Sequence, residues 1–101
     1  MITYSVTVSI DESLAADWQR WMLTQHIPDV MSTGFFEDFQ LRRLLEPAPD
    51  PGTATFNTQY RCKDLNTLHQ YQATAAKMLQ ADHENRYRGR YAAFRTVLEE
   101  I

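Results

Sequence analysis

His26 is the side chain of this sequence best placed for acid–base chemistry. It lies beside the apolar stripe of an expected helix, one turn after Met22 and two residues before Pro28. Because the free pKa of an imidazole is about 6.5, a histidine at the edge of a cleft is a candidate general acid or base. The alternative role is structural, in which the imidazole hydrogen-bonds a carbonyl that loses its partner beside the proline.

Trp18, Trp21 and Met22 are the candidate apolar contacts of a ligand. The two tryptophans lie three residues apart, so on a helix they share one face and would line a pocket for a planar molecule. The competing interpretation is core packing, because large aromatic residues on the buried face of a helix ordinarily fill a small core.

A basic group near the C-terminus is the candidate set for binding an anion. It comprises His83, Arg86, Arg88, Arg90 and Arg95. Arginines bind carboxylates and phosphates through paired N–H donors, and we expect His83, Arg86 and Arg95 to contact a ligand. The alternative is a solvated helix end in which Glu84 pairs with Arg88 four residues later. Arg95 would then form a salt bridge or a contact across a subunit interface.

Cys62 and the histidines do not form a recognisable nucleophile or metal site. A cysteine nucleophile needs a partner base to become a thiolate, and none is visible beside Cys62, so we expect a buried, inert thiol. The histidines at 26, 69 and 83 lack the spacing that places two ligands on one helix face. We therefore expect no metal and no cofactor.

The elements that position these side chains follow from periodicity and breakers. A period-two pattern predicts a strand over residues 2–10, and a helix follows from Asp11, is disturbed at Pro28 and ends at Gly34. Two strands, 35–45 and 53–61, flank a proline-rich loop. A second helix runs from Asp64 to Gly89, with an expected buried stripe, and a last strand covers 90–101. The stripe is Leu65, Leu68, Gln72, Ala75 and Leu79.

This order predicts an α+β, ferredoxin-like βαββαβ fold, a four-stranded antiparallel sheet with two helices on one face. The other face should be polar, with alternate residues of strands 2–10 and 53–61 on it. We expect Val97, Ile101 and residues 35–45 to add apolar groups to that face. Such a surface predicts a homodimer joined through its sheets, with trapped water at the interface.

Composition bounds the class of protein. The 101 residues, 44% of them hydrophobic and 23% charged, suit one domain spanning 1–101. The net charge of −3 disfavours nucleic acid as a partner. No apolar run reaches membrane-spanning length and the N-terminus lacks a leader pattern, so we expect no membrane association. A single cysteine favours a reducing compartment, which predicts a cytoplasmic protein.

Four segments resemble a small bacterial family known only as domain-of-unknown-function family 4286. They are Trp18-x-x-Trp21-Met22-x-x-x-His26-Ile27-Pro28-x-Val30-Met31-x-Thr33-Gly34-x-Phe36, Leu41-Arg42-Arg43-Leu44-Leu45-Glu46, His83-x-x-Arg86-Tyr87 and Phe94-Arg95-Thr96-Val97-Leu98-Glu99. That family is similar to the dimeric α/β-barrel superfamily, whose members place two ferredoxin-like sheets face to face and hold ligands between each sheet and its helices. The resemblance implies fold and dimer more than activity.

Two functions remain open. One is a homodimer that binds a small organic molecule between sheet and helices, with His26 as a possible acid or base. The other is a non-catalytic dimeric interaction or regulatory module. RNA binding, which shares the βαββαβ order, is disfavoured because the aromatic residues of the central strands are expected under the helices. Whether the protein is an enzyme is not decided by its sequence.

Overall fold

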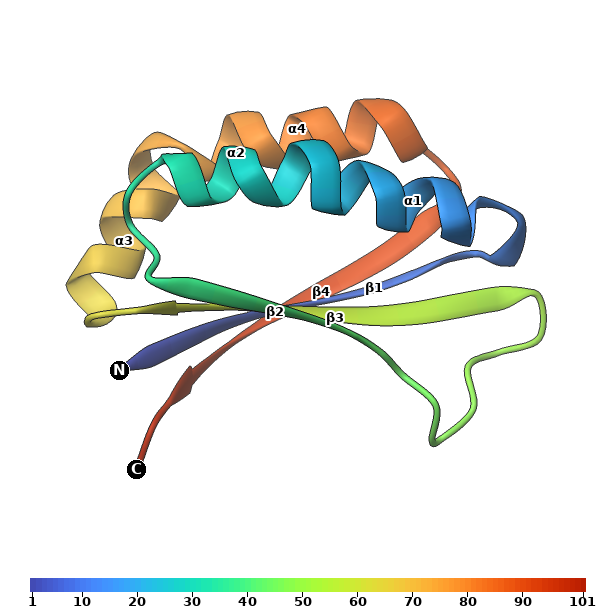
Figure 1. The fold of residues 1–101 in the computed structure, drawn as a ribbon, viewed down its shortest axis with the longest axis horizontal. Helices are drawn as coiled ribbons and strands as arrows, with labels where there is room; N and C mark the ends of the chain where they lie inside the picture. Colours follow the sequence, from blue (N-terminus) through green and yellow to red (C-terminus); the bar gives the residue numbers. More distant parts are fainter.

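A four-stranded antiparallel sheet carries all the helices on one face (Figure 1), as a computed structural model of residues 1–101 shows. The strands are β1 (Ile2–Asp11), β2 (Asp38–Arg43), β3 (Thr53–Cys62) and β4 (Tyr91–Glu99). Their spatial order is β2-β3-β1-β4, so the two ten-residue strands lie in the centre. This arrangement confirms the predicted ferredoxin-like fold.

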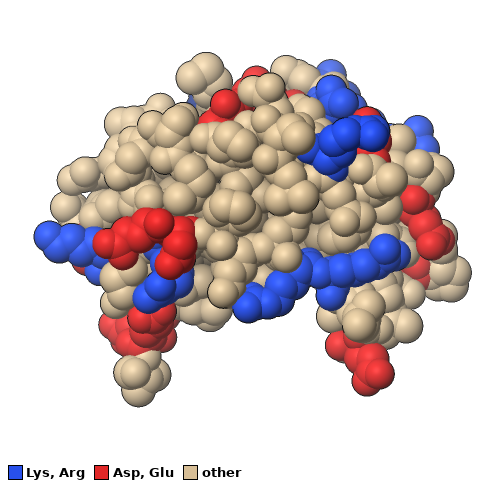
Figure 2. All heavy atoms as spheres, in the orientation of Figure 1, with Lys and Arg blue, Asp and Glu red and all other residues tan.

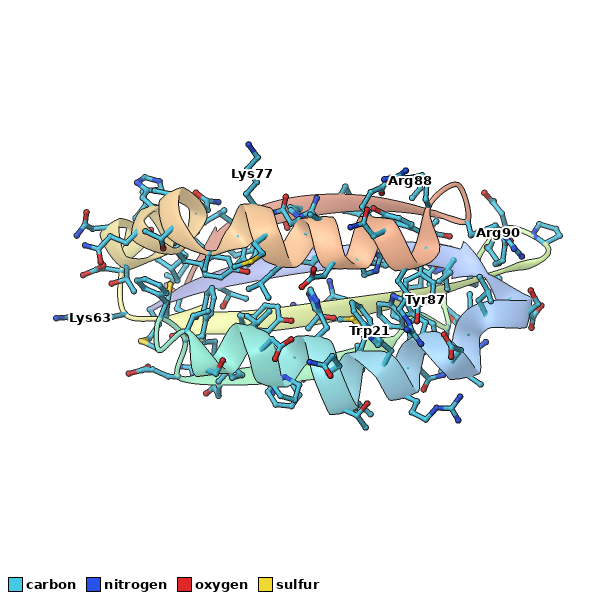
Figure 3. The ribbon with its side chains drawn as sticks, turned by 90° about the horizontal axis from the view of Figure 1, so that it is seen from above. Trp21, Lys63, Lys77, Tyr87, Arg88 and Arg90 are labelled. Atoms are coloured by element: carbon cyan, nitrogen blue, oxygen red, sulfur yellow. The ribbon has the colours of Figure 1, made fainter.

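The helices form two runs that lie side by side above the sheet (Figure 3). The first run is η1 (Glu12–Leu14), α1 (Ala15–Trp21), η2 (Met22–His26) and α2 (Ile27–Ser32), and the second is α3 (Leu65–Thr74) and α4 (Ala76–Tyr87). Trp21 and Tyr87 meet between the runs, with ring centroids 5.6 Å apart. None of these helices is long and apolar enough to span a membrane.

The first helical run changes its geometry where Pro28 was expected to disturb it. The five residues of η2 form a π-helical turn directly before α2, and Pro28 lies in the first turn of α2. A proline gives no N–H to the preceding turn and its ring crowds the carbonyl four residues earlier, which a wider turn relieves. Gly34, at φ +83°, ends the run. Asp11, from which the helix was expected to start, makes no cap hydrogen bond through its carboxylate and instead pairs with Arg90.

The second helical run begins as predicted but buries a different stripe. Asp64 accepts a hydrogen bond from the backbone N–H of Thr67 at 2.8 Å, and the helix is interrupted at Ala75. The inward residues are Leu68, Tyr71, Ala76, Leu79, His83 and Tyr87. The expected stripe was wrong at Leu65 and Gln72, which are exposed. Tyr71, next to Gln72, occupies the inward position because its ring buries far more apolar area than an amide.

Alternation along the strands separates a core face from a polar face. Tyr4, Phe56 and Tyr60 are buried beneath the helices, where they belong to the hydrophobic core. On the opposite face Asn57 donates from Nδ2 to Ser5 Oγ at 2.9 Å and to Thr7 Oγ1 at 3.1 Å. Polar groups of β1 and β3 therefore satisfy one another on that face.

The apolar groups expected on the polar face were partly assigned to the wrong side. Val97 pairs with Tyr4, and Phe39 and Leu41 of β2 pair with Tyr60 and Thr58, so all three lie on the helix side of the sheet. The register places Phe94 and Leu98 on the polar face instead, both exposed. A shift of one residue moves a strand side chain to the other face of the sheet. The edge strands carry apolar residues at both odd and even positions, so their sequence did not indicate which positions face the helices.

Charged side chains are distributed over the surface rather than gathered in one field. In Figure 2 basic side chains lie over the central part of the sheet edge that faces the viewer, and acidic groups lie toward both ends. β2, which ends in Arg42 and Arg43, forms this edge of the sheet.

Candidate functional site

A cavity lies between the sheet and the helices. Its apolar wall is formed by Val6, Val8, Met22, Val30 and Leu79. The space open to water-sized groups is about 40 Å³. Since one water needs roughly 10–15 Å³ of such space, the cavity as it stands holds about three waters.

The cavity opens to solvent between α4 and β4. Of its lining residues only Gln80 of α4 and Arg95 of β4 are exposed, while Tyr91 and Ala93 are half-buried. Arg95 lies opposite Val6 in the sheet register, on the helix side. The mouth of the cavity therefore carries a guanidinium group.

His83 forms one inner wall of the cavity and is held there by Trp18. The indole Nε1–H of Trp18 donates to Nε2 of His83 at 2.9 Å. An indole nitrogen is only a donor, so Nε2 carries no proton and the neutral ring is protonated at Nδ1. Burial, with the nearby His26 and Arg95, lowers the pKa of His83 to about 4. His83 is therefore neutral near pH 7, and its Nδ1–H has no acceptor within the protein.

The side chain of His26 extends from η2 toward His83 of α4. Its ring stacks on Trp21 with centroids 5.0 Å apart and approaches His83 edge-on at 6.0 Å. Neither nitrogen hydrogen-bonds a protein group, so the expected alternative of a bond to a helix carbonyl does not occur. Burial is the main cause that lowers the pKa of His26, Arg95 adds to it, and Asp29 and Asp82 oppose it. The imidazole has both a donor and an acceptor available.

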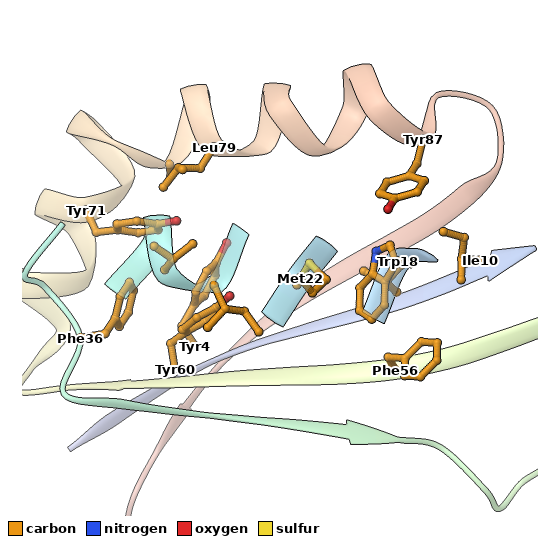
Figure 4. Packing of buried hydrophobic residues seen from close by; sticks show 14 of the residues in the cluster. Tyr4, Ile10, Trp18, Met22, Phe36, Phe56, Tyr60, Tyr71, Leu79 and Tyr87 are labelled. Carbon is orange, nitrogen blue, oxygen red and sulfur yellow. The ribbon is translucent and has the colours of Figure 1, made fainter. Parts of the chain in front are cut away.

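Four of the hydroxyl groups in the lining make no hydrogen bond to the protein, whereas that of Tyr91 donates to Glu84. Thr58 Oγ1 is the one buried side-chain nitrogen or oxygen of the chain without a hydrogen-bond partner. Tyr4, Tyr60 and Tyr71 pack their rings together, 6.3 Å between Tyr4 and Tyr60 and 6.1 Å between Tyr4 and Tyr71. In Figure 4 their oxygens lie on the side of the cluster toward Met22. Burial raises the pKa of Tyr60 and Tyr71, so both remain protonated donors.

Thr58 is a site residue that sequence reasoning missed. It lies between Phe56 and Tyr60 in the period-two pattern of β3 and so must face inward with them. A threonine among inward aromatic residues was the available signal, because an inward hydroxyl needs a partner. Tyr71 was missed for the reason given above, the wrong phase of the second helix.

The residues expected to bind a ligand do not all meet in the cavity. Met22, His26, His83 and Arg95 line it. Trp18 is fully buried, with its ring centroid 4.8 Å from that of Phe56, and it contacts the site only through its hydrogen bond to His83.

Trp21 and Arg86 lie outside the cavity. The guanidinium of Arg86 lies over the Trp21 ring at 5.5 Å, in a shallow depression between the helical runs. Arg86 is also within 3.5 Å of an oxygen of Asp17. These two residues therefore face the outer helical surface.

The basic group expected near the C-terminus separates into paired and unpaired members. Arg86 pairs with Asp17, Arg88 with Glu84 at 3.7 Å and Arg90 with Asp11. Arg95 makes no ion pair, so the salt bridge expected as its structural role is absent within the chain. Arg95 is therefore an unpaired positive charge at the mouth of the cavity.

Cys62 lies away from the cavity, fully buried. Its thiol donates weakly to the backbone oxygen of Asp64 at 3.5 Å, and burial raises its pKa. A raised pKa keeps the thiol protonated and unreactive near neutral pH. No group of three or more His, Cys, Asp or Glu side chains lies together in a way that would hold a metal ion.

The family model described as a domain of unknown function (DUF4286) matches residues 1–101. Solved structures with a similar fold include an antibiotic biosynthesis monooxygenase, with TM-score 0.64, 14% identity and coverage of 100% of this chain and 99% of that one. A dimeric ferredoxin-like protein from an uncultured marine organism has TM-score 0.72, 5% identity and coverage of 100% and 95%. A mutant of MhuD with two manganese protoporphyrin IX bound per active site has TM-score 0.73, 13% identity and coverage of 100% and 95%. No curated protein matches the chain. At these identities the likeness shows the fold alone.

Proposed function

The chain belongs to the DUF4286 family, a domain of unknown function, over residues 1–101, and from its own site we propose that it binds a small organic molecule between sheet and helices. The ligand would contact Met22, His26, His83 and Arg95, with Thr58 and the tyrosine hydroxyls as further hydrogen-bonding groups. His26 would act as acid or base on a ligand that exchanges a proton.

One observation carries this proposal: polar groups without protein partners meet in a single, mostly apolar cavity. Folded proteins pair nearly all their buried polar groups, because an unpaired one costs roughly 1–3 kcal/mol. Thr58 Oγ1 is buried without a partner. In the same lining, both nitrogens of His26 and the Nδ1–H of His83 remain accessible from the cavity and make no hydrogen bond to the protein. An apolar pocket with a few convergent polar groups is the usual form of a ligand site.

The similar structures support a ligand without naming it. A protein of this fold is described with two porphyrins per active site, and another as a monooxygenase. Both support the capacity of the fold for organic ligands. The present cavity is much smaller than a porphyrin, so we propose a ligand of a few non-hydrogen atoms, or a single ring admitted by movement of Met22.

We also propose a homodimer joined through the polar faces of two sheets, in the cytoplasm. The face offers the hydrogen-bonded groups of β1 and β3 together with exposed Phe94 and Leu98 of β4. A similar structure is described as dimeric. A lone buried Cys62 suits a reducing compartment.

A non-catalytic interaction module is the second candidate, and the small volume of the cavity favours it. The two candidates are separated with benzyl alcohol as the probe, by thermal shift and by NMR of the Trp18 indole N–H, which reports on the cavity through His83. We expect benzyl alcohol to raise the melting temperature and to shift that resonance.

The matched variants are Ala93→Leu, which fills the cavity from β4, and Ala81→Leu, which adds the same atoms to an exposed position of α4. We expect Ala93→Leu to abolish the effect of benzyl alcohol and Ala81→Leu to keep it. If the probe leaves the wild-type indole resonance unmoved, the cavity is not a ligand site and the interaction module stands.

A further inference from the structure

We propose that the ligand of this cavity is a small monocarboxylic acid whose carboxylate binds Arg95 at the mouth and whose apolar part lies beneath α4. This inference rests on the proposed function, that the cavity binds a small organic molecule, and adds the chemical class of that molecule.

The charges of the lining select an anion. Arg95 is its one permanently charged residue, and no Asp or Glu lines the cavity. The other arginines near the C-terminus are paired with carboxylates, whereas Arg95 is not. A guanidinium forms two parallel N–H···O bonds with a carboxylate, and an unpaired one beside an apolar space is suited to that contact.

One positive charge also limits the charge of the ligand. His83 is neutral near pH 7 and is tied to Trp18, so it adds a neutral N–H donor and no second cation. A phosphate carries close to two negative charges at pH 7 and is ordinarily held by several cations or by backbone N–H groups. A monocarboxylate matches the single guanidinium.

The register gives the ligand an orientation. Thr58 pairs with Val6 and Val6 pairs with Arg95, so the three lie in one row across β3, β1 and β4 on the helix side. With strands roughly 4.8 Å apart, the backbones of Thr58 and Arg95 are about 10 Å apart. A carboxylate at Arg95 directs the rest of a short acid over Val6 toward the hydroxyl of Thr58, which lacks a partner.

Benzoate and benzamide test this inference, because they share shape and differ in charge. We expect wild-type protein to bind benzoate about tenfold more tightly than benzamide, the factor for one hydrogen-bonded ion pair. Dissociation constants come from NMR titration at fixed ionic strength, with butanoate and butanamide as a smaller matched pair.

Two arginine variants locate the effect. Arg95→Gln should weaken benzoate about tenfold and leave benzamide unchanged. Arg42→Gln is the matched control, because Arg42 lies on the opposite face of the sheet, next to Asn57 in the register. It removes the same charge and should leave both affinities unchanged.

The outcomes separate the inference from the function on which it rests. Equal binding of benzoate and benzamide, or benzoate binding that survives Arg95→Gln, overturns the carboxylate assignment while a cavity that binds small molecules remains. Failure of all four probes and of benzyl alcohol overturns the proposed function itself.

Discussion

The buried hydroxyl of Thr58 has opposite effects on the stability of the free protein and on the proposed ligand binding. Its hydroxyl is buried, lines the cavity and has no partner, although its neighbours on β3 pack as an ordinary core. In the free protein an unpaired buried hydroxyl lowers the free energy of unfolding, and a ligand that hydrogen-bonds it would remove this penalty.

Thr58→Val should therefore raise the free energy of unfolding of the free protein by about 1 kcal/mol, because valine has nearly the same shape and no hydroxyl. Urea denaturation measures the change. Thr55→Val is the control, since Thr55 donates to Ser9 Oγ at 3.2 Å on the polar face, and its loss should destabilise. A destabilised Thr58→Val would mean that the hydroxyl has a partner in solution.

His83 predicts a pH dependence of stability. Its folded pKa of about 4 lies below the ordinary value of 6.5, so below pH 6.5 the unfolded chain binds the proton first. The free energy of unfolding should fall as pH drops from 6.5 toward 4, by up to about 3 kcal/mol. His26, whose pKa is also lowered, acts in the same direction.

Urea unfolding at several pH values between 7 and 4.5 measures this loss. His83→Gln should flatten the curve in that window, because glutamine can still accept from Trp18 and does not titrate. His69→Gln makes the same substitution at an exposed residue of α3 and is the matched control for the replacement itself. Equal slopes in wild type and His83→Gln would show that the imidazole is not held neutral.

At the scale of elements, η2 is the feature that sets His26 apart from an ordinary helix residue. The π-helical turn ends at His26, directly before the α2 turn that contains Pro28. A π-helical turn rotates the following side chains relative to a regular α-helix, and such turns often occur at functional sites.

Pro28→Ala tests whether this turn positions the imidazole. With a backbone N–H restored, we expect the turn to tighten and His26 to move relative to Trp21. Binding of benzyl alcohol should weaken about fivefold, the value of one lost hydrogen bond of about 1 kcal/mol. NMR titration and the imidazole proton shifts measure both effects. Unchanged shifts and affinity would show that η2 does not depend on the proline.

The sequence predicted most of these elements because their signals are local. Alternation located β1 and β3, Asp64 marked the start of α3, and Gly34 and Gly89 marked helix ends. The sequence indicated a site between sheet and helices and four of its lining residues, Met22, His26, His83 and Arg95. It could not give the complete lining, which comes from β1, β3, β4 and both helical runs. Trp18 shows the limit: its periodicity indicated a buried residue, but nothing local indicated that its N–H reaches a histidine 65 residues later.

At the scale of the whole molecule, the polar sheet face is the surface through which we propose that two copies assemble. Phe94 is 63% exposed and Leu98 48% exposed on that face, beside the polar side chains of β1 and β3. If two copies pack through this face, the contact is self-complementary and should bury at least about 1,000 Å².

We expect light scattering after size exclusion to give twice the chain mass of 11.8 kDa at micromolar concentration. Phe94→Asp should raise the dissociation constant of the dimer about thirtyfold, as for a central aromatic contact of roughly 2 kcal/mol. Leu23→Asp is the control, because Leu23 is 52% exposed on the helical layer, away from the sheet. A single-chain mass at every concentration, or equal effects of the two variants, would contradict the proposed interface.

The strict alternation of β1 has a consequence for how this protein can diverge. Tyr4, Val6 and Val8 face the cavity, while Ser5 and Thr7 face the polar side through the same ten-residue strand. Substitutions at the even positions of β1 therefore affect the cavity face, and substitutions at its odd positions affect the polar face, nearly independently of each other. Selection on the even positions would change which molecules fit the cavity. Selection on the odd positions would change the strength of the proposed self-association. A combinatorial library randomised at the even positions of β1 should change ligand binding and leave the proposed self-association intact, and a library randomised at the odd positions should do the reverse.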